Sequence, residues 1–296
     1  MLRRVAYLAV LVGVALALTG CALSFFGYER RAEWRDAEEK TCMRAGWVVE
    51  SAYVQPEPGL DGRGACGMYE PLKVSAMEGG AVALGPSATI NCPMTAAVES
   101  WLTEAVQPAA LAWFGEPIVE LRQLGAYACR PIDNIEGNSL SEHAFGNAID
   151  IAAFRLMDGS FVTVKTDWYG GGDAARGFLR EAFAAACERF KTVLGPGARY
   201  HGDHFHLDLA HHNDLGTSRY CKPMPDGPAP ERAPYSGMVA GNQRPVPYDW
   251  TPTGSICRPK PGPLLKDPPR DVIAGELSGP SGVGNLQSGY IQGGVN

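Results

Sequence analysis

The sequence predicts an α+β fold in which an antiparallel sheet is flanked by helices. Segments with helical periodicity and short segments typical of strands both occur, but without the regular strand–helix alternation of a parallel sheet. Both ends of the 296-residue chain also differ in composition from the part between them. We therefore expect one globular domain of about 200 residues, residues 28–221, between two ends that do not form a packed core.

Three segments are predicted to be helical. Residues 29–46 are rich in charge and end at Gly46, a residue that commonly terminates helices. Residues 94–114 carry apolar side chains at helical spacing and follow Pro93, which suits a first helical turn. Residues 172–190 form an apolar stripe, and we expect Asp173 to cap this helix.

Four segments are predicted to be strands: residues 118–127, 148–154, 161–165 and 205–209. Asp158 and Gly159 are expected to form a hairpin turn between the second and the third. In the last strand, a period of two places His204, His206 and Asp208 on one face. The opposite face is apolar and should pack into the core, so the polar face should line a site.

The N-terminal residues 1–27 have the composition of an export signal. Two arginines precede a charge-free, mostly apolar run, residues 5–27, that contains the sequence LTGC. This pattern resembles a bacterial lipoprotein signal, which implies lipidation of Cys21. A run of this length could instead remain as a transmembrane signal-anchor. Either interpretation places the domain on the periplasmic side of the cell envelope, anchored to the membrane.

The body of the chain contains six cysteines, an even number that is typical of disulfides in an exported domain. They are Cys42, Cys66, Cys92, Cys129, Cys187 and Cys221. Three disulfides are expected, but 15 pairings are possible. Some of the six could alternatively be buried thiols. Cys257 is left over and could be a free thiol or an intermolecular link.

Charge and composition restrict the possible partners. The formal net charge of −6 and the isoelectric point near 5.6 argue against nucleic acid, which requires a basic surface. Residues 222–296 contain most of the prolines and few runs that could pack. Such a segment buries too little apolar surface to offset the entropy of ordering it, so we expect a mostly disordered tail. The sequence does not indicate a partner for this tail.

All six histidines lie in two short stretches, residues 141–150 and 201–212. The first contains His143 and Asp150, and Gly146 between them permits a close approach of the chain. The second contains His204 and His206. Imidazole and carboxylate groups together suit Zn²⁺, so the two stretches predict one metal site. The alternative is that these are polar loop residues and satisfied histidines on a strand surface.

Several motifs resemble those of known families. The sequence SEHAFGNAID is similar to the S-x-H-x-x-G-x-A-x-D signature of zinc peptidases. These include D-alanyl-D-alanine carboxypeptidases, L-alanyl-D-glutamate endolysins and penicillin-insensitive murein endopeptidases, and HGDHFHL resembles the H-x-H motif of the last branch. With GAYACRPI, TVLGPG and DHFHLDLA, the segment 42–221 more closely resembles the bacterial extensin-like C-terminal domain family. The resemblance implies a fold of the zinc DD-peptidase, hedgehog-like type.

The resemblance also implies a ligand set. His143, Asp150 and His206 would bind zinc and leave a fourth position for water, as catalytic zinc requires. His204 is the favoured proton-transfer group, because on a strand it points with His206, and Asp203 and His201 are second choices. Alternatively, His204 rather than His206 is the third ligand. His201, three residues before His204, would then take the place that Asp203 has relative to His206.

Other polar residues have weaker assignments. Arg130 resembles the arginine with which relatives bind substrate and stabilise an oxyanion, although it could form only a surface salt bridge. Ser141 would orient its loop or contact the substrate backbone. His211 and His212 lie beyond the strand and are expected to be exposed.

The resulting hypothesis is a zinc-dependent peptidase that hydrolyses peptide bonds of peptidoglycan stem or cross-link peptides by metal-activated water. The alternative is a non-catalytic binding module of the cell envelope that retains the fold, with or without the metal.

Overall fold

The computed structural model describes residues 30–232. The predicted signal segment with Cys21 lies outside these residues, as do Cys257 and most of the predicted tail. Within residues 30–232, no helix has both the length and the apolar character needed to cross a membrane.

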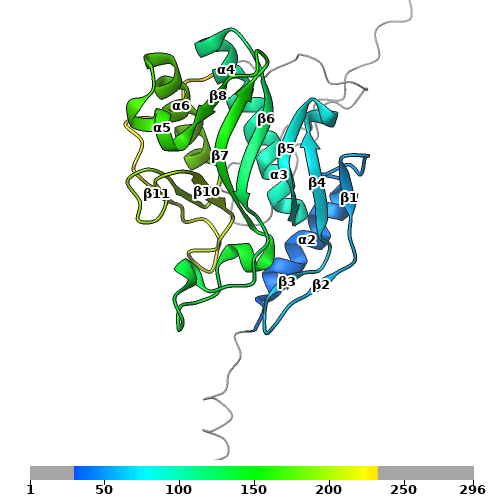
Figure 1. Cartoon of the computed structure of the whole chain (residues 1–296). Coiled ribbons are helices and arrows are strands. Elements are labelled where there is room, and N and C mark those ends of the chain that lie inside the picture. Colours follow the sequence, from blue (N-terminus) through cyan, green and yellow to red (C-terminus); the bar gives the residue numbers. More distant parts are fainter. Residues whose placement is uncertain (1–29, 233–296) are drawn as a thin grey trace, which may run out of the picture. The chain divides into compact units, whose positions relative to one another are not determined.

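The described residues form a mixed α+β domain around one large, mostly antiparallel sheet (Figure 1). The strand order is β1-β4-β5-β6-β7-β10-β9-β11, and β8 pairs with β7. Among the named strands of the described residues, only the β5/β6 and β9/β11 pairs are parallel. The strands are β1 (Val54–Pro56), β4 (Leu72–Met77), β5 (Val82–Ile90), β6 (Ile118–Gly125), β7 (Ala148–Leu156), β8 (Phe161–Thr163), β9 (Thr192–Leu194), β10 (Phe205–Asp208) and β11 (Tyr220–Lys222). A separate small hairpin consists of β2 (Leu60–Asp61) and β3 (Gly67–Met68).

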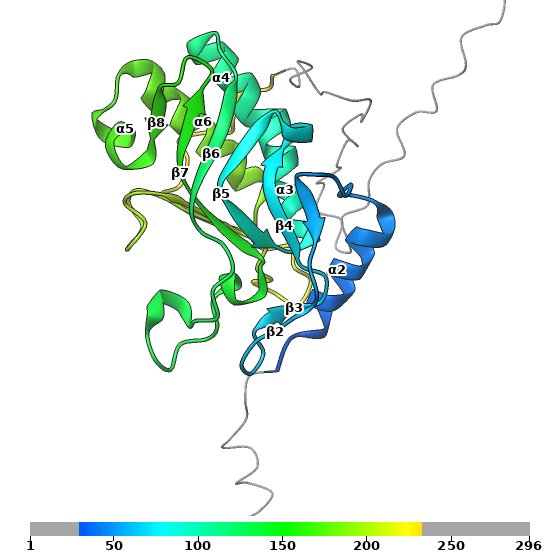
Figure 2. The same cartoon turned by 45° about the vertical axis from the view of Figure 1, so that its right-hand side comes forward.

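Helices α3 and α6 pack behind this sheet in both views (Figures 1 and 2). The core between them contains interlocking aromatic rings, among them Trp101, Phe154, Phe178, Phe183 and Phe205. The helices are α2 (Glu33–Ala45), α3 (Cys92–Trp101), α4 (Gln107–Phe114), α5 (Val164–Gly170) and α6 (Asp173–Arg189). Short 3-10 turns are η1 (Glu78–Gly80), η3 (Ile132–Asn134) and η4 (Glu142–Phe145).

The predicted helix over residues 94–114 is longer and less regular than expected. It begins at Cys92, where the side chain of Asn91 caps it by accepting a hydrogen bond from the Met94 amide at 2.8 Å. A π-helical turn, η2 (Leu102–Val106), separates α3 from α4. Pro108 follows this turn and has no amide hydrogen to donate to the carbonyl four residues earlier, which accounts for the wider turn.

The other helix predictions are confirmed in position. Helix α2 ends at Gly46, which adopts the left-handed conformation with φ of 66°. Helix α6 begins at Asp173, but the prediction that Asp173 caps it is wrong: Gly172 is the N-cap and no side chain caps the helix. Asp173 instead forms an ion pair with Arg176 in the first turn.

The strand predictions hold in part. The hairpin at Asp158 and Gly159 is confirmed, and Gly159 adopts φ of 90°. Residues 164 and 165 are not part of a strand, because the Thr163 hydroxyl caps α5 and begins a helix there. The strands between residues 54 and 90 were not predicted. Strand β1 has only three residues and β5 contains Gly85 and Pro86, so neither shows a long alternating pattern, whereas β4 alternates buried and exposed residues over its first four positions.

Three disulfides form, as the cysteine count predicts. Cys42–Cys92 joins α2 to α3, and Cys187–Cys221 joins α6 to β11. Cys66–Cys129 ties the segment after β6 to the β2/β3 hairpin. The start of the predicted tail also contacts the domain, since Lys222 belongs to β11 and the Arg232 guanidinium pairs with Glu181 of α6 at 2.5 Å. The three disulfides therefore join helices, strands and loops that are far apart in sequence but adjacent in the folded domain.

Candidate metal centre

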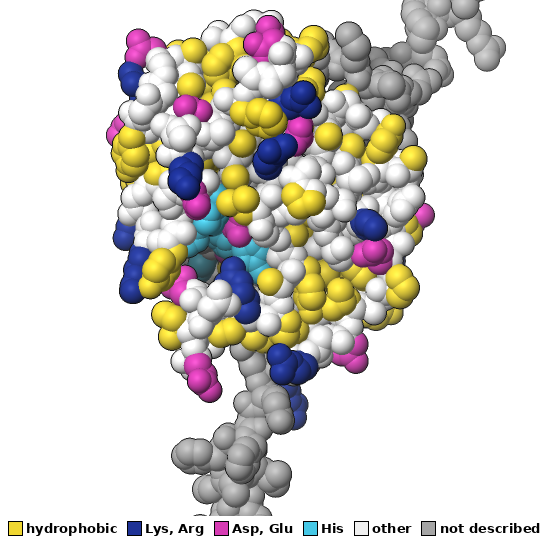
Figure 3. Space-filling model, in the orientation of Figure 1, with side chains coloured by type: hydrophobic (Ala, Val, Ile, Leu, Met, Phe, Trp, Pro, Cys, Tyr) yellow, Lys and Arg dark blue, Asp and Glu magenta, His cyan; other side chains and the backbone are white. Residues whose placement is uncertain are grey.

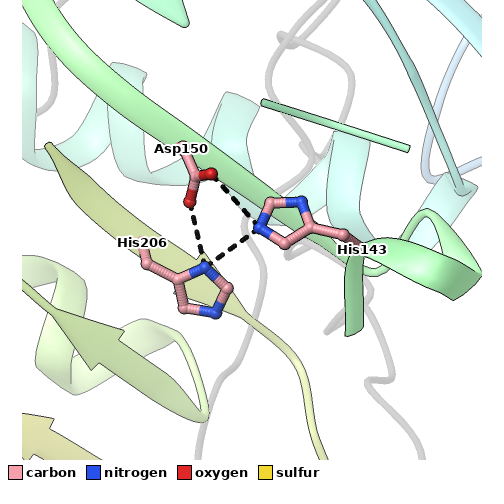
Figure 4. Close-up of side chains that lie close together, drawn as sticks. All are labelled: His143, Asp150 and His206. Carbon is pink, nitrogen blue, oxygen red and sulfur yellow. Dashed lines mark hydrogen bonds and ion pairs between the residues drawn. The ribbon is translucent and has the colours of Figure 1, made fainter. Parts of the chain in front are cut away.

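Three side chains from two neighbouring strands and one turn point toward a common centre (Figure 4). Strands β7 and β10 are antiparallel, and their register places His206 directly opposite Asp150. His143 comes from η4, immediately before β7. One ligand atom from each of the three residues can be chosen so that all lie within 4.8 Å of one another. The sequence-predicted ligand residues are therefore together in space.

The turn that carries His143 is fixed at both ends. Ser141 caps η4, and its hydroxyl accepts a hydrogen bond from the His143 amide at 3.4 Å. Gly146 ends the turn with φ of 61°, and a Cβ there would collide with the Met68 sulfur. Ser141 thus orients its loop through this cap, which is the first of the two roles expected for it.

Each histidine is oriented by a second hydrogen bond. Nδ1 of His143 contacts the Ala126 carbonyl oxygen at 2.6 Å, so Nε2 faces the centre, 3.3 Å from Asp150 Oδ2. Nδ1 of His206 lies 3.0 Å from Asp150 Oδ1, while Nε2 of His206 lies 3.0 Å from Asp208 Oδ2. Metal-binding histidines commonly have such outer partners, which select the tautomer and hold the ring.

Asp208 and Ala126 were not assigned a role from the sequence. The two-residue spacing already places Asp208 on the face of His206, so a signal for Asp208 was present. Ala126 offers only its carbonyl group, and no sequence signal marks it.

Burial and charge distinguish this cluster from ordinary surface residues. His143, Asp150 and His206 are all buried. Burial raises the pKa of Asp150, but hydrogen bonds and charges from His143 and His206 outweigh it and hold that pKa well below its usual range. Burial lowers the pKa of His206, yet Asp150 and Asp208 raise it to about 10. Two buried carboxylates around one imidazole favour positive charge at this position, either as a proton on His206 or as a cation in its place.

The residues present fit a zinc ion on chemical grounds. Two imidazole nitrogens and one carboxylate oxygen are a ligand set found in catalytic zinc sites. The described residues offer no other group of three such side chains close enough together to hold a metal.

His201, Asp203 and His204 lie beside this centre. Nε2 of His204 is 3.6 Å from Asp150 Oδ1, and Nδ1 of His204 is 2.8 Å from Asp203 Oδ1. The His201 ring lies 5.1 Å from the His204 ring and 5.6 Å from the His206 ring, centroid to centroid. Burial lowers the pKa of His201. Asp203 therefore contacts His204, and the three residues whose ligand atoms lie mutually within 4.8 Å are His143, Asp150 and His206, with His204 adjacent to Asp150.

A groove of about 550 Å³ opens beside the centre. His143 and Asp150 lie at its wall with Arg130, Tyr127 and residues 87–89 of β5. In the space-filling view, the histidine side chains form the floor of a hollow with charged side chains at its rim (Figure 3). Arg130 thus shares a cavity with two of the three central residues, as its expected role in substrate binding requires.

His211 and His212 do not join the centre. His212 is exposed, as expected, and its ring nitrogen contacts the Thr192 hydroxyl at 2.8 Å. The expectation that His211 is exposed is wrong. Its ring stacks on Trp34 at a centroid distance of 3.7 Å and contacts the Glu38 carboxylate at 3.1 Å, because α2 lies against this loop.

Fold and site together define a mixed α+β domain with a buried His/Asp/His cluster at the edge of a groove. Residues 40–222 match the family described as Extensin-like protein C-terminus. Because this match covers more than half of the chain, the protein belongs to that family. Comparison with the curated proteins gave no match.

Proposed function

We propose that the protein is a zinc-dependent peptidase that hydrolyses peptide bonds of peptidoglycan stem or cross-link peptides. The observation that carries this proposal is the convergence of His143, Asp150 and His206 beside an open groove. The motif resemblance to zinc DD-peptidases supports the substrate class, and with it a fold of that type.

His143, through Nε2, His206, through Nδ1, and Asp150 would hold the zinc ion. When bound, zinc would lower the pKa of a coordinated water toward about 7 and polarise a substrate carbonyl. Ala126 and Asp208 would keep the two imidazoles oriented, since each contacts the ring nitrogen that faces away from the centre.

His204 is the proposed proton-transfer group. Its Nδ1 contacts the Asp203 carboxylate, which would hold the hydrogen on Nδ1 and leave Nε2 free to accept a proton on the side of Asp150. Asp203 would then orient and stabilise the charged imidazole. This arrangement favours His204 over Asp203 and His201 as the base.

Arg130 is the proposed contact for the substrate. Its guanidinium, a planar cation with several hydrogen-bond donors, lines the same groove as His143 and Asp150. It is suited to bind a peptide carboxylate or carbonyl oxygen and to stabilise negative charge that develops during hydrolysis.

We also propose that the domain acts on the periplasmic side of the cell envelope, held by its N-terminal segment. The basic and apolar composition of residues 1–27, with Cys21 after small residues, supports export and lipidation. The three disulfides are typical of an oxidising compartment and agree with this location.

The test compares the full chain with His206→Ala, and uses the exposed His212→Ala as the matched control. Zinc content is measured by elemental analysis, and each protein is incubated with murein sacculi whose soluble products are separated by chromatography. One zinc per chain and cleavage, both lost in His206→Ala and kept in the control, would support the proposal. Zinc without new muropeptides would favour the envelope-binding module, and absence of zinc would contradict the metal site itself.

A further inference from the structure

The turn that carries His143 is clamped from outside by helix α2. Glu142, the residue before His143, directs its carboxylate away from the centre toward α2. There the Arg35 guanidinium donates two parallel hydrogen bonds to it, at 2.5 and 2.6 Å. Both side chains are nearly buried, with 11% and 13% of their surface exposed. A two-point contact between planar groups restricts orientation as well as distance.

Aromatic rings enclose the same guanidinium. Its carbon lies 3.7 Å from the centroid of the Phe145 ring and 4.3 Å from that of Trp34. Phe145 is the last residue of η4, so Arg35 contacts this turn at both ends. A guanidinium can stack on rings while it binds a carboxylate, whereas a lysine ammonium cannot do both in this geometry.

Glu142 passes this constraint to the strand that carries Asp150. Its Oε2 also accepts a hydrogen bond from the Asn147 side chain at 2.7 Å, and Asn147 Oδ1 accepts one from Asn91 at 3.1 Å. Asn147 precedes β7 directly. The Asn91 amide donates to the Gly146 carbonyl at 2.9 Å, which fastens the end of the turn to the start of α3.

Helix α2 is itself firmly held, so it can serve as a fixed support. The buried Glu39 carboxylate accepts hydrogen bonds from the amides of Tyr69 and Glu70 at 2.8 and 3.0 Å. The disulfide Cys42–Cys92 attaches α2 to α3 one residue after Asn91. The contacts therefore form a closed path from α2 through Arg35, Glu142, Asn147 and Asn91 back to α2.

We propose that Arg35 is a positioning residue for the metal centre: through Glu142 it sets the position of the His143 imidazole relative to Asp150 and His206. This inference rests on the proposed zinc site but concerns a helix that touches none of the three ligand residues in the contacts described above. Metal sites tolerate displacements of only about 0.2 Å in ligand distance, so a loosened turn should weaken binding.

The test measures zinc affinity by competition with a chromophoric chelator for the full chain and for Arg35→Met, Arg35→Lys and Glu142→Gln. Arg44→Met is the matched control, because Arg44 is exposed on the same helix and hydrogen-bonds only to the Lys40 carbonyl among the contacts found for it. Visible spectra of the Co²⁺-loaded proteins report ligand geometry independently of activity.

We expect Arg35→Met to bind zinc about 10- to 100-fold more weakly and to show altered Co²⁺ bands, as for other partners outside the ligand set. Arg35→Lys should restore part of the affinity, and Glu142→Gln, which keeps its shape, should lose less than Arg35→Met. Arg44→Met should resemble the wild type.

Two results would overturn the inference. If wild type binds zinc while Arg35→Met and Glu142→Gln keep its affinity and Co²⁺ spectrum, Arg35 has only a structural role and the zinc proposal stands. If wild type binds no zinc, both proposals fail together. If Arg35→Met binds zinc more weakly but the wild type does not cleave murein, the positioning role of Arg35 is supported and the proposed peptidase function is contradicted. Should Arg35→Met not fold, Glu142→Gln decides by the same criteria.

Discussion

Gly125→Ala should weaken metal binding without destabilising the protein. Gly125 ends β6, beside Asp150, in a backbone conformation that alanine also adopts. A Cβ at this position would lie 2.7 Å from Asp150 Oδ2 and 3.8 Å from His143 Cε1. An ordinary contact between carbon and oxygen is about 3.3 Å or longer, so the Asp150 carboxylate must retreat by about 0.6 Å.

That displacement exceeds the tolerance of about 0.2 Å for metal–ligand distances. We therefore expect zinc affinity to fall about 10- to 100-fold, which corresponds to about 1.4 to 2.8 kcal/mol of binding free energy. The free energy of unfolding without metal should change by less than about 1 kcal/mol, because alanine also restricts the unfolded chain. Only the stabilisation that added zinc confers should decrease.

The measurement is a chelator competition for zinc affinity, combined with thermal unfolding in the presence of chelator or zinc. Gly170→Ala is the matched control, since a Cβ at Gly170 meets no atom within 4 Å. Equal zinc affinities for Gly125→Ala and the wild type would refute the reasoning, because the carboxylate would then not need its present position.

Three further predictions concern other contacts. Asp208→Asn should lower zinc affinity about 10- to 100-fold in chelator competition, because Nε2 of His206 loses its carboxylate partner, and unchanged affinity would exclude this supporting role. Burial raises the pKa of Glu99 to about 7 from 4.5, so the folded state keeps a proton that the unfolded state releases, and the contribution of this group to stability should fall by about 3 kcal/mol between pH 4 and 8. In urea unfolding, the change in stability of Glu99→Gln between these two pH values should differ from that of the wild type by about this amount, whereas the exposed Glu50→Gln should match the wild type. Replacing Cys66 and Cys129 by alanine should cost about 4 kcal/mol in urea unfolding, given their separation of 63 residues, and a loss below about 1 kcal/mol would contradict the loop-entropy estimate.

Local patterns were sufficient for the elements that have strong periodicity. Helix α6 and strand β10 were predicted because an apolar stripe and a period of two are properties of consecutive residues. The strands between residues 54 and 90 were missed for the opposite reason. They pair largely with one another, but β1 has only three residues and β5 contains Gly85 and Pro86, so these two strands have no sustained alternation, whereas the alternation of β4 was present and was overlooked.

The candidate site shows the same division. The residue types of His143, Asp150 and His206, together with the resemblance of their motifs, are enough to indicate one metal site. The antiparallel register of β7 and β10 places Asp150 opposite His206, and no short-range rule specifies that register. The Ala126 carbonyl was invisible to residue-type reasoning, because every residue has one.

The sequence by itself determined the α+β class, the number of disulfides and the residues from which a metal centre can be built, because these depend on composition and local spacing. Only the tertiary structure decided which of 15 cysteine pairings occurs, which histidine nitrogen faces the centre, and that Arg35 and Glu142 meet across 107 residues. These contacts join segments far apart in the chain. They depend on how the helices and strands pack, which local sequence patterns do not specify.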